Sequence, residues 1–260
     1  TLERKGYLVL KPVRESQTVR ELKVKHIRLT SDGRSFDISG SNALQNAPKQ
    51  MQLFESLKTE YDAIKLSVAR NTFGDSAVNG LKNKGYIEIF LVVVSRDPLA
   101  GIDFPNPENI NLTKAQQVAA GHINTSIDSH DYNSFLLQGV TGSGKTEVYI
   151  NAIKKCISQG RRSIVLVPEI ALTHQIISRL ASRFPNKVAV LHSGLTPGER
   201  YDQWWKIRRG EYPIVVGSRS AIFSPQMDLG LIIIDEEHEW TYKQIDPEPR
   251  YHTREVAIKL

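Results

Sequence analysis

The sequence is poor in cysteine and contains no long run of apolar residues. Cys156 is the single cysteine among 260 residues, which excludes an internal disulfide and any cysteine-based zinc site within this chain. No apolar run approaches the roughly 20 residues of a membrane-spanning helix. The first residues also show no signal-peptide pattern. These absences favour a cytoplasmic protein with no membrane partner.

The sequence also lacks a strong charge bias, because its formal net charge is only +6. This surplus is compatible with nucleic-acid binding but does not demonstrate it.

The chain begins with Thr1 rather than Met, and its last residues, "REVAIKL", read as an unfinished helix. We therefore expect it to be cut from a longer protein.

A stretch rich in proline, aspartate and asparagine, residues 95–111, interrupts the sequence. Such turn-forming residues do not continue a helix or a central strand, so we place the main domain boundary here. The expected segments are the tail of a truncated preceding module (1–30), a loop (31–46), a winged-helix domain (47–96), a linker (97–111) and an α/β domain that is truncated at its C-terminus (112–260).

The segment 47–96 has the pattern of a small α+β winged-helix domain. Helical patterns cover "APKQMQLFESLKT", "YDAIKLSVAR" and "DSAVNGLKNKG", and the strand-like run "YIEIFLVVVS", with a possible return strand, follows them. If this domain binds DNA, then Asn79, Lys82 and Lys84 lie near the nucleic acid. A protein-docking or spacer function fits the pattern equally well, and both interpretations stay open.

After residue 111 the pattern changes to alternating strands and helices. Short apolar runs, separated mostly by helical segments, are typical of a parallel sheet with helices on both faces. The expected strands are residues 134–138, 163–167, 187–191, 214–217 and 231–234. The helix "TPGERYDQWWKIRRG" has a capping box formed by Thr196 and Glu199, and Gly210 ends it. Core packing of at least one residue of the pair Trp204 and Trp205 is expected.

The octapeptide "GVTGSGKT" has the pattern of a phosphate-binding loop between a strand and a helix. Its glycines let backbone N–H groups approach phosphates at a helix N-terminus. We expect Lys145 to reach the β- and γ-phosphates of ATP and Thr146 to be a Mg²⁺ ligand. The predicted nucleotide-binding residues are Gly139, Thr141, Gly142, Ser143, Gly144, Lys145 and Thr146.

The stretch "LIIIDEE" runs from an apolar strand into acidic residues, as a Walker B motif does. We expect Asp235 to hold Mg²⁺ and Glu236 to orient or deprotonate the attacking water. A zinc-protease motif starting at His238 would need a second histidine where Tyr242 stands. A purely structural strand cap would leave the phosphate loop without a metal partner.

The order of the motifs resembles superfamily 2 helicases. "NLTKAQ" is similar to their adenine-reading segment, in which Gln116 would contact the base. More narrowly, the motifs "GVTGSGKTEVY", "LVPEIALTHQ", "LHSGLTPGER", "VVGSRSAIFSP", "IIIDEEHEWTYKQ" and "RYHTREVA" closely resemble the primosomal protein N′ (PriA) family of replication-restart helicases. This resemblance covers most of residues 112–260. It implies a RecA-like P-loop domain, which would here be helicase lobe 1.

The resemblance also implies a function and a set of partners. The family consists of 3′-to-5′ ATP-driven DNA translocases that act at abandoned forks, with primosome and single-strand-binding proteins as partners. It implies a nucleoid-associated location. It further implies a zinc-binding insertion and a second RecA-like lobe in the complete protein, outside this chain. Without the second lobe, we expect weak ATP binding and little hydrolysis.

The family positions of the motifs imply the DNA contacts of lobe 1. The backbone contacts would come from Thr173, Ser218, Arg219 and Ser220. Trp240, Tyr242 and Lys243 would lie in an aromatic-rich loop, where rings stack on any base. His238 would connect this loop to the catalytic acids. For the rings, core packing is the alternative. Two other functions also stay open, a non-catalytic DNA-binding adaptor and an ATP-gated protein scaffold.

Overall fold

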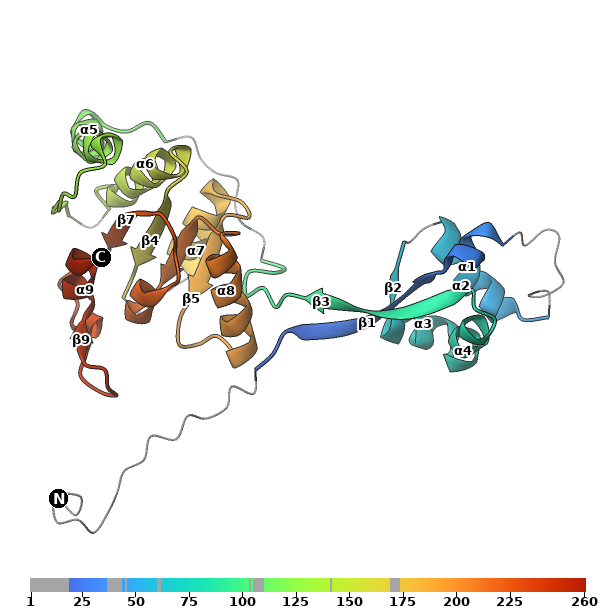
Figure 1. Ribbon diagram of the computed structural model, residues 1–260. Coiled ribbons are helices and arrows are strands. Elements are labelled where there is room, and N and C mark those ends of the chain that lie inside the picture. Colours follow the sequence, from blue (N-terminus) through green and yellow to red (C-terminus); the bar gives the residue numbers. More distant parts are fainter. Residues whose placement is uncertain are drawn as a thin grey trace, which may run out of the picture. The chain divides into compact units, whose positions relative to one another are not determined.

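The computed structural model describes residues 19–36, 44, 46–59, 62–102, 104, 110–140, 142–168 and 174–260. The chain forms two compact units (Figure 1). Residues Glu21–Ser95 are the smaller unit, and Arg96–Leu260 form the larger unit together with the segment up to Arg20. Ser95 therefore ends the smaller unit one residue before the boundary expected from the sequence. The described residues of the predicted linker form turns and irregular coil within the larger unit.

The smaller unit is an antiparallel sheet with helices packed on it. The sheet has the strand order β2-β1-β3, and β1 pairs with β3 from Leu22 opposite Val94 to Leu29 opposite Ile87. Its core contains Ile27, Leu53 and Phe54 among other apolar residues. The elements are β1 (Leu22–Leu29), α1 (Ser31–Ser35), α2 (Pro48–Thr59), β2 (Ile64–Lys65), α3 (Leu66–Phe73), α4 (Asp75–Asn83) and β3 (Ile87–Val94).

This pairing corrects the expected segments at the front of the chain. The sequence predicts a separate module up to residue 30, whereas β1 is the central strand of the small unit. The predicted loop 31–46 contains α1, and the predicted return strand after β3 is absent because β3 is continuous and pairs with β1. A local pattern cannot reveal a pairing between strands that are far apart in the sequence. Residues 1–18, 37–43 and 45 lie outside the described residues.

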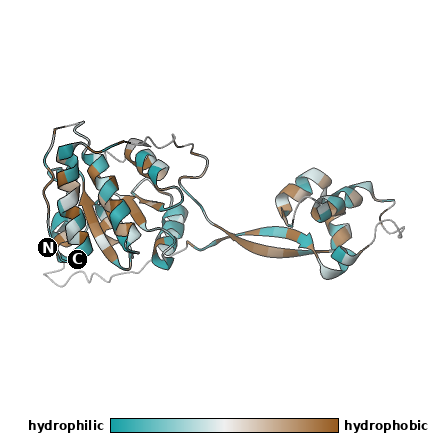
Figure 2. Ribbon diagram, turned by 90° about the horizontal axis from the view of Figure 1, so that it is seen from above, coloured by the Kyte–Doolittle hydropathy of each residue, from teal (hydrophilic) through white to brown (hydrophobic). Residues whose placement is uncertain are grey.

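The larger unit contains a four-stranded parallel sheet with the strand order β5-β6-β4-β7. Figure 2 shows these apolar strands between helices whose outer surfaces are more hydrophilic. The elements are α5 (Lys114–Ser129), α6 (Lys145–Ser158), β4 (Arg162–Leu166), α7 (His174–Arg183), β5 (Val188–Leu191), α8 (Pro197–Arg209), β6 (Ile214–Gly217), η2 (Arg219–Phe223), β7 (Leu229–Ile234), η3 (Trp240–Tyr242), β8 (Lys243–Gln244), β9 (Tyr251–His252) and α9 (Thr253–Lys259).

Alternate residues of the strands enter two separate hydrophobic clusters, one on each face of the sheet. On one face, Val165 packs with residues of α6 and α7, such as Ile153 and Leu180. On the other face, Ile164 packs with Ile207 of α8 and with residues of η2, η3 and α9. The predicted RecA-like α/β domain, with a parallel sheet and helices on both faces, is therefore confirmed. No helix in the described part of the chain is long and apolar enough to cross a bilayer.

One predicted strand does not form. Residues 134–138, expected as the strand before the phosphate loop, are irregular, and Leu136 is 79% exposed. Among the described residues, β7 is the outer strand of the sheet and has a single partner, β4. An apolar run becomes a strand only where it pairs with a neighbour, and its composition alone does not supply one.

Candidate active site

The phosphate loop has the backbone that its glycines predict. Gly142 and Gly144 both have a φ of +79°, a left-handed conformation that glycine adopts at low cost. The N–H of Ser143 donates to the carbonyl of Val140 over 3.1 Å, and α6 begins at Lys145. The loop therefore leads directly into a helix N-terminus, which favours anionic ligands. Thr141 lies outside the described residues.

Lys145 lies between the loop and the acidic end of β7. Its Nζ donates to the carbonyl of Gly139 over 2.8 Å and lies 4.0 Å from Oε1 of Glu236. The structure thus brings together the predicted phosphate-binding cation and the predicted water-orienting carboxylate. Glu236 has a φ of +47°, which is uncommon for a residue with a side chain and is typical of strained positions in active sites.

Asp235 follows the last residue of β7 and is held by two tyrosines. The phenol of Tyr149, on α6, donates to Oδ1 of Asp235 over 3.2 Å. Burial raises the pKa of the Asp235 carboxyl, and the hydrogen bond from Tyr149 opposes this effect. Burial, followed by the charge of Asp235, raises the pKa of the Tyr149 phenol, so Tyr149 remains a donor at neutral pH. The phenol of Tyr242 donates to the backbone carbonyl of Asp235 over 2.7 Å.

The sequence analysis did not single out Tyr149. It lies three residues after Thr146 on α6, so both residues share a helix face. Because the Tyr149 phenol reaches Asp235, the first turn of α6 lies beside the end of β7. Helical spacing from the phosphate loop was the available signal.

The residues around this site fit Mg²⁺ bound together with a nucleotide. Thr146 and Asp235, the predicted Mg²⁺ ligands, carry side-chain oxygens on two segments that meet at the Tyr149–Asp235 hydrogen bond. The described residues contain no cluster of three or more histidine, cysteine, aspartate or glutamate side chains that could hold a metal ion. Mg²⁺ needs no such cluster, because it commonly takes one or two protein oxygens and completes its shell with phosphates and water.

Gln116 contacts the phosphate loop directly. Its Oε1 accepts the N–H of Thr113 over 2.8 Å, which forms half of a capping box at the start of α5. Its Nε2 donates to the carbonyl of Ser143 over 2.9 Å. A Cβ added to Gly144 would lie 2.4 Å from Nε2 of Gln116, so glycine is needed for this approach. The predicted adenine-reading residue is thus part of the same site.

The predicted DNA contacts at residues 218–220 separate into exposed and buried residues. Ser220 is exposed and Arg219 is half-buried. Arg219 donates to the carbonyls of Thr241 and Lys243 over 3.4 and 3.5 Å. Ser218 is 4% exposed, and a side chain this buried does not reach DNA, which corrects its prediction as a DNA contact. Thr173 lies outside the described residues.

The aromatic-rich loop also divides. Trp240 is 73% exposed and Lys243 is exposed, as a DNA-contacting surface requires. Tyr242 is 1% exposed and packs in the same cluster as Ile164, so its predicted stacking on DNA is wrong. Its ring is part of the hydrophobic core, and its hydroxyl donates to the backbone carbonyl of Asp235. His238 is exposed, with Nε2 3.9 Å from Oε2 of Glu236.

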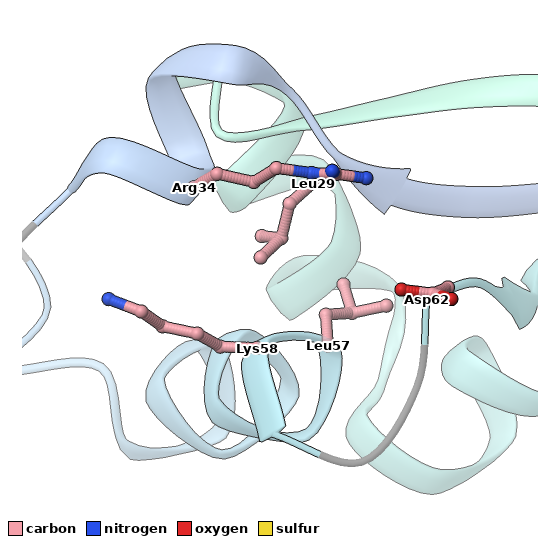
Figure 3. Close-up of a pocket in the computed structure, with 5 residues that line it drawn as sticks. All are labelled: Leu29, Arg34, Leu57, Lys58 and Asp62. Atoms are coloured by element: carbon pink, nitrogen blue, oxygen red, sulfur yellow. The ribbon is translucent and has the colours of Figure 1, made fainter.

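Three predicted DNA contacts belong to the other unit. Asn79 and Lys82 are exposed on α4, and Lys84, at the end of this helix, donates from Nζ to Oε1 of Gln50 over 3.0 Å. The same unit contains a pocket whose lining joins the apolar side chains of Leu29 and Leu57 with the charged side chains of Arg34, Lys58 and Asp62 (Figure 3). The pocket contains none of the predicted site residues.

Comparison with known proteins assigns the family. A model of the DEAD/DEAH box helicases matches residues 113–258. Replication restart protein PriA of Bacillus subtilis is 42% identical over 248 residues, which are 94% of this chain and 31% of that protein. PriA of Haemophilus influenzae is 38% identical over 85% of this chain and 31% of that protein. PriA of Synechocystis is 44% identical over 70% of this chain and 21% of that protein.

The chain thus spans less than a third of the length of these relatives. Among solved structures, RecG bound to a three-way DNA junction aligns with a TM-score of 0.42 and 23% identity, over 49% of this chain and 21% of that chain. The matched helicase model covers more than half of the chain, and the chain therefore belongs to the DEAD/DEAH box helicase family, as a relative of replication restart protein PriA.

Proposed function

We propose that this chain is the ATP-binding lobe, with an attached winged-helix domain, of a 3′-to-5′ DNA helicase of replication restart. The observation that supports it best is the meeting of Lys145 with Glu236, at 4.0 Å, beside the half-buried carboxyl of Asp235. A phosphate loop that no longer bound nucleotide would not require this arrangement. The similarity to PriA proteins supports the choice of a DNA motor over other ATPases.

Each of these residues would act on ATP in a different way. Lys145 would neutralise charge on the β- and γ-phosphates, and Glu236 would hold the attacking water. Thr146 and Asp235 would hold Mg²⁺, which supplies charge neutralisation to the phosphates. Gln116 would contact the adenine base while it remains bonded to the loop at Ser143. His238 would respond to the state of Glu236 from 3.9 Å away.

The proposed DNA surface of this lobe consists of Arg219, Ser220, Trp240 and Lys243. The hydrogen bonds from Arg219 to Thr241 and Lys243 make η2 and the aromatic-rich loop a continuous structure. Contacts of this kind position the phosphate backbone and read little sequence. In the smaller unit, Asn79, Lys82 and Lys84 would bind duplex DNA. A protein-docking function is the alternative there.

The partners and the location follow from the same proposal. Primosome and single-strand-binding proteins would act with the complete protein at stalled forks, and the protein would be cytoplasmic and associated with the nucleoid. A zinc site would lie outside this chain. The chain covers 31% of PriA of Bacillus subtilis, so a second lobe would lie in the rest of the complete protein. That lobe would stabilise part of the charge of the transition state. The chain alone should therefore bind ATP weakly and turn it over slowly.

A titration with a fluorescent ATP analogue and Mg²⁺ tests the proposal. Lys145→Ala should weaken binding at least about tenfold, because a charge-assisted contact to phosphate is lost. Lys155→Ala is the matched control, since Lys155 lies on the same helix and pairs instead with Asp128 at 2.6 Å. Equal affinities of wild type and Lys145→Ala would contradict the proposed site. DNA binding without any nucleotide binding would favour the adaptor instead, and robust DNA-stimulated turnover would contradict the need for a second lobe.

A further inference from the structure

The chain enters and leaves the smaller unit at one point on the larger unit. Arg20 is the last residue before the smaller unit, and Arg96 is the first residue after it. The guanidinium of Arg96 donates from Nη2 to the backbone carbonyl of Arg20 over 2.8 Å. The two connections are therefore bonded to each other within the larger unit.

One carboxylate on α8 holds Arg96 directly, and it holds Arg20 only through Arg96. Oδ2 of Asp202 accepts the backbone N–H of Arg96 over 2.9 Å and its Nε over 2.7 Å, and Oδ1 accepts Nη2 over 3.3 Å. Asp202 is 8% exposed. Charge-assisted bonds from a planar guanidinium to both carboxylate oxygens are strong and specific in direction. This pair thus fixes both the side chain and the backbone of Arg96.

The part of α8 that carries Asp202 is bonded to the sheet and leaves space for the Arg96 side chain. The neighbouring Gln203 is buried and accepts the N–H of Val190, in β5, over 3.3 Å. Gly198 lies in the first turn of α8, where a Cβ would come within 2.1 Å of Nη1 of Arg96. Glycine in a helix costs stability, so its presence here is explained by the close approach of the guanidinium.

We propose that Arg96, Asp202 and Gly198 form an anchor that clamps both chain connections to α8 and so restricts the positions that the smaller unit can sample. Without the anchor, Arg96 would be bonded neither to Asp202 on α8 nor to Arg20, and only the pairing of β1 with β3 would hold the two connections together. The anchor acts whether or not either unit binds DNA.

Two measurements on this 260-residue chain test the anchor. Hydrogen exchange measures how fast the backbone amide of Arg96 exchanges with solvent. Single-molecule energy transfer measures the distance between two dyes, one attached at Glu55→Cys and one at Lys187→Cys, which are exposed positions in different units. The native Cys156 is buried and resists labelling. In Arg96→Ala the distance distribution should broaden. In Asp202→Asn it should also broaden, and the Arg96 amide should exchange at least about tenfold faster, because the charge of its acceptor is lost.

Gly198→Ala separates the anchor from the stability of α8. Alanine raises helix propensity, yet its Cβ would displace the Arg96 guanidinium, so α8 should stay folded by circular dichroism while the distance distribution broadens. Arg209→Ala is the control, because Arg209 lies on the same helix but forms an exposed ion pair with Glu211, outside the helix, whose loss should change neither measurement. The anchor is refuted if Asp202→Asn and Gly198→Ala leave the distance distribution unchanged, even with faster amide exchange, or if Arg209→Ala broadens it equally.

Discussion

The phenol of Tyr242 donates a hydrogen bond to the backbone carbonyl of Asp235 over 2.7 Å, from a ring that is almost completely buried. Thr253 donates in turn to the carbonyl of Tyr242 over 3.0 Å, so the start of α9 is connected to the same residue. The end of β7, the aromatic-rich loop and α9 are thus joined through one buried residue, by its side chain to β7 and by its backbone to α9. Tyr242 therefore positions the Walker B acid and does not contact DNA.

Replacing Tyr242 should destabilise the protein according to what is removed. Tyr242→Phe keeps the packing and loses one buried hydrogen bond, which should cost about 1 kcal/mol of unfolding free energy. Tyr242→Ala also leaves a cavity and should cost about 3–5 kcal/mol. Urea denaturation measures both values. Tyr132→Phe, at an exposed position, is the control. A Tyr242→Phe protein as stable as wild type would show that the bond to Asp235 contributes nothing.

Replacing the exposed Trp240 should weaken DNA binding and leave the stability almost unchanged. Trp240→Ala should leave the unfolding free energy within about 0.5 kcal/mol of wild type, because the ring has little packing to lose. It should weaken single-stranded DNA binding by about 1–3 kcal/mol, the usual contribution of a stacked base. Fluorescence anisotropy with a labelled oligonucleotide measures this loss. Undiminished DNA binding, or DNA-stimulated ATPase activity that is unchanged in the complete protein, would exclude a DNA-sensing function for Trp240.

Two glycines of the same lobe should respond with opposite signs to alanine. Gly144→Ala forces a left-handed residue to carry a Cβ that would lie 2.4 Å from Nε2 of Gln116, so it should cost at least about 1–2 kcal/mol of stability and impair nucleotide binding. Gly121→Ala, inside α5 with open space around its Cβ, should stabilise the protein by about 0.5–1 kcal/mol. Thermal denaturation compares the two. A stabilising Gly144→Ala would contradict the observed loop geometry.

The raised pKa of Asp235 predicts a pH dependence of stability. Its folded pKa lies above its unfolded value because of burial, so the folded state binds more protons between the two values. The stability contribution of this group is therefore lost as the pH rises through the folded pKa. Asp235→Asn, which removes the buried charge but keeps an oxygen acceptor for Tyr149, should be more stable than wild type at pH 7.

This advantage of Asp235→Asn should shrink as the pH falls toward the ordinary aspartate pKa. Melting temperatures of both proteins from pH 4 to pH 8 measure it. Asp228→Asn is the control, since its carboxylate has no ion pair within the described residues. A constant difference between Asp235→Asn and wild type across this range would show that Asp235 does not titrate differently in the folded state.

Much of the proposed ATP site was predictable from the sequence because its requirements are local. The left-handed backbone at Gly142 and Gly144 demands glycine, and the lysine that follows begins a helix at a spacing set by the loop itself. The acids at the end of an apolar strand were also visible, because parallel strands place their carboxyl ends on one edge of the sheet. The alternation of apolar strands with helices was enough to predict the parallel sheet.

The predictions that failed concern burial and pairing between distant segments. The same aromatic-rich loop exposes Trp240 and buries Tyr242, and only the packing of η3 against the sheet distinguishes them. The strand expected at residues 134–138 has no partner among the described residues, and β1 pairs with β3, which follows it in the sequence only after four helices.

The sequence by itself determined the chemistry of the phosphate loop, the identity of the acids and the class of the fold, because these depend on backbone conformation and local periodicity. The tertiary structure decided which rings face solvent, which tyrosine holds Asp235 and where Arg96 is fixed. The meeting of Arg96 with Asp202 depends on bringing distant residues together at a cost in chain entropy, and only the complete set of packed contacts offsets that cost.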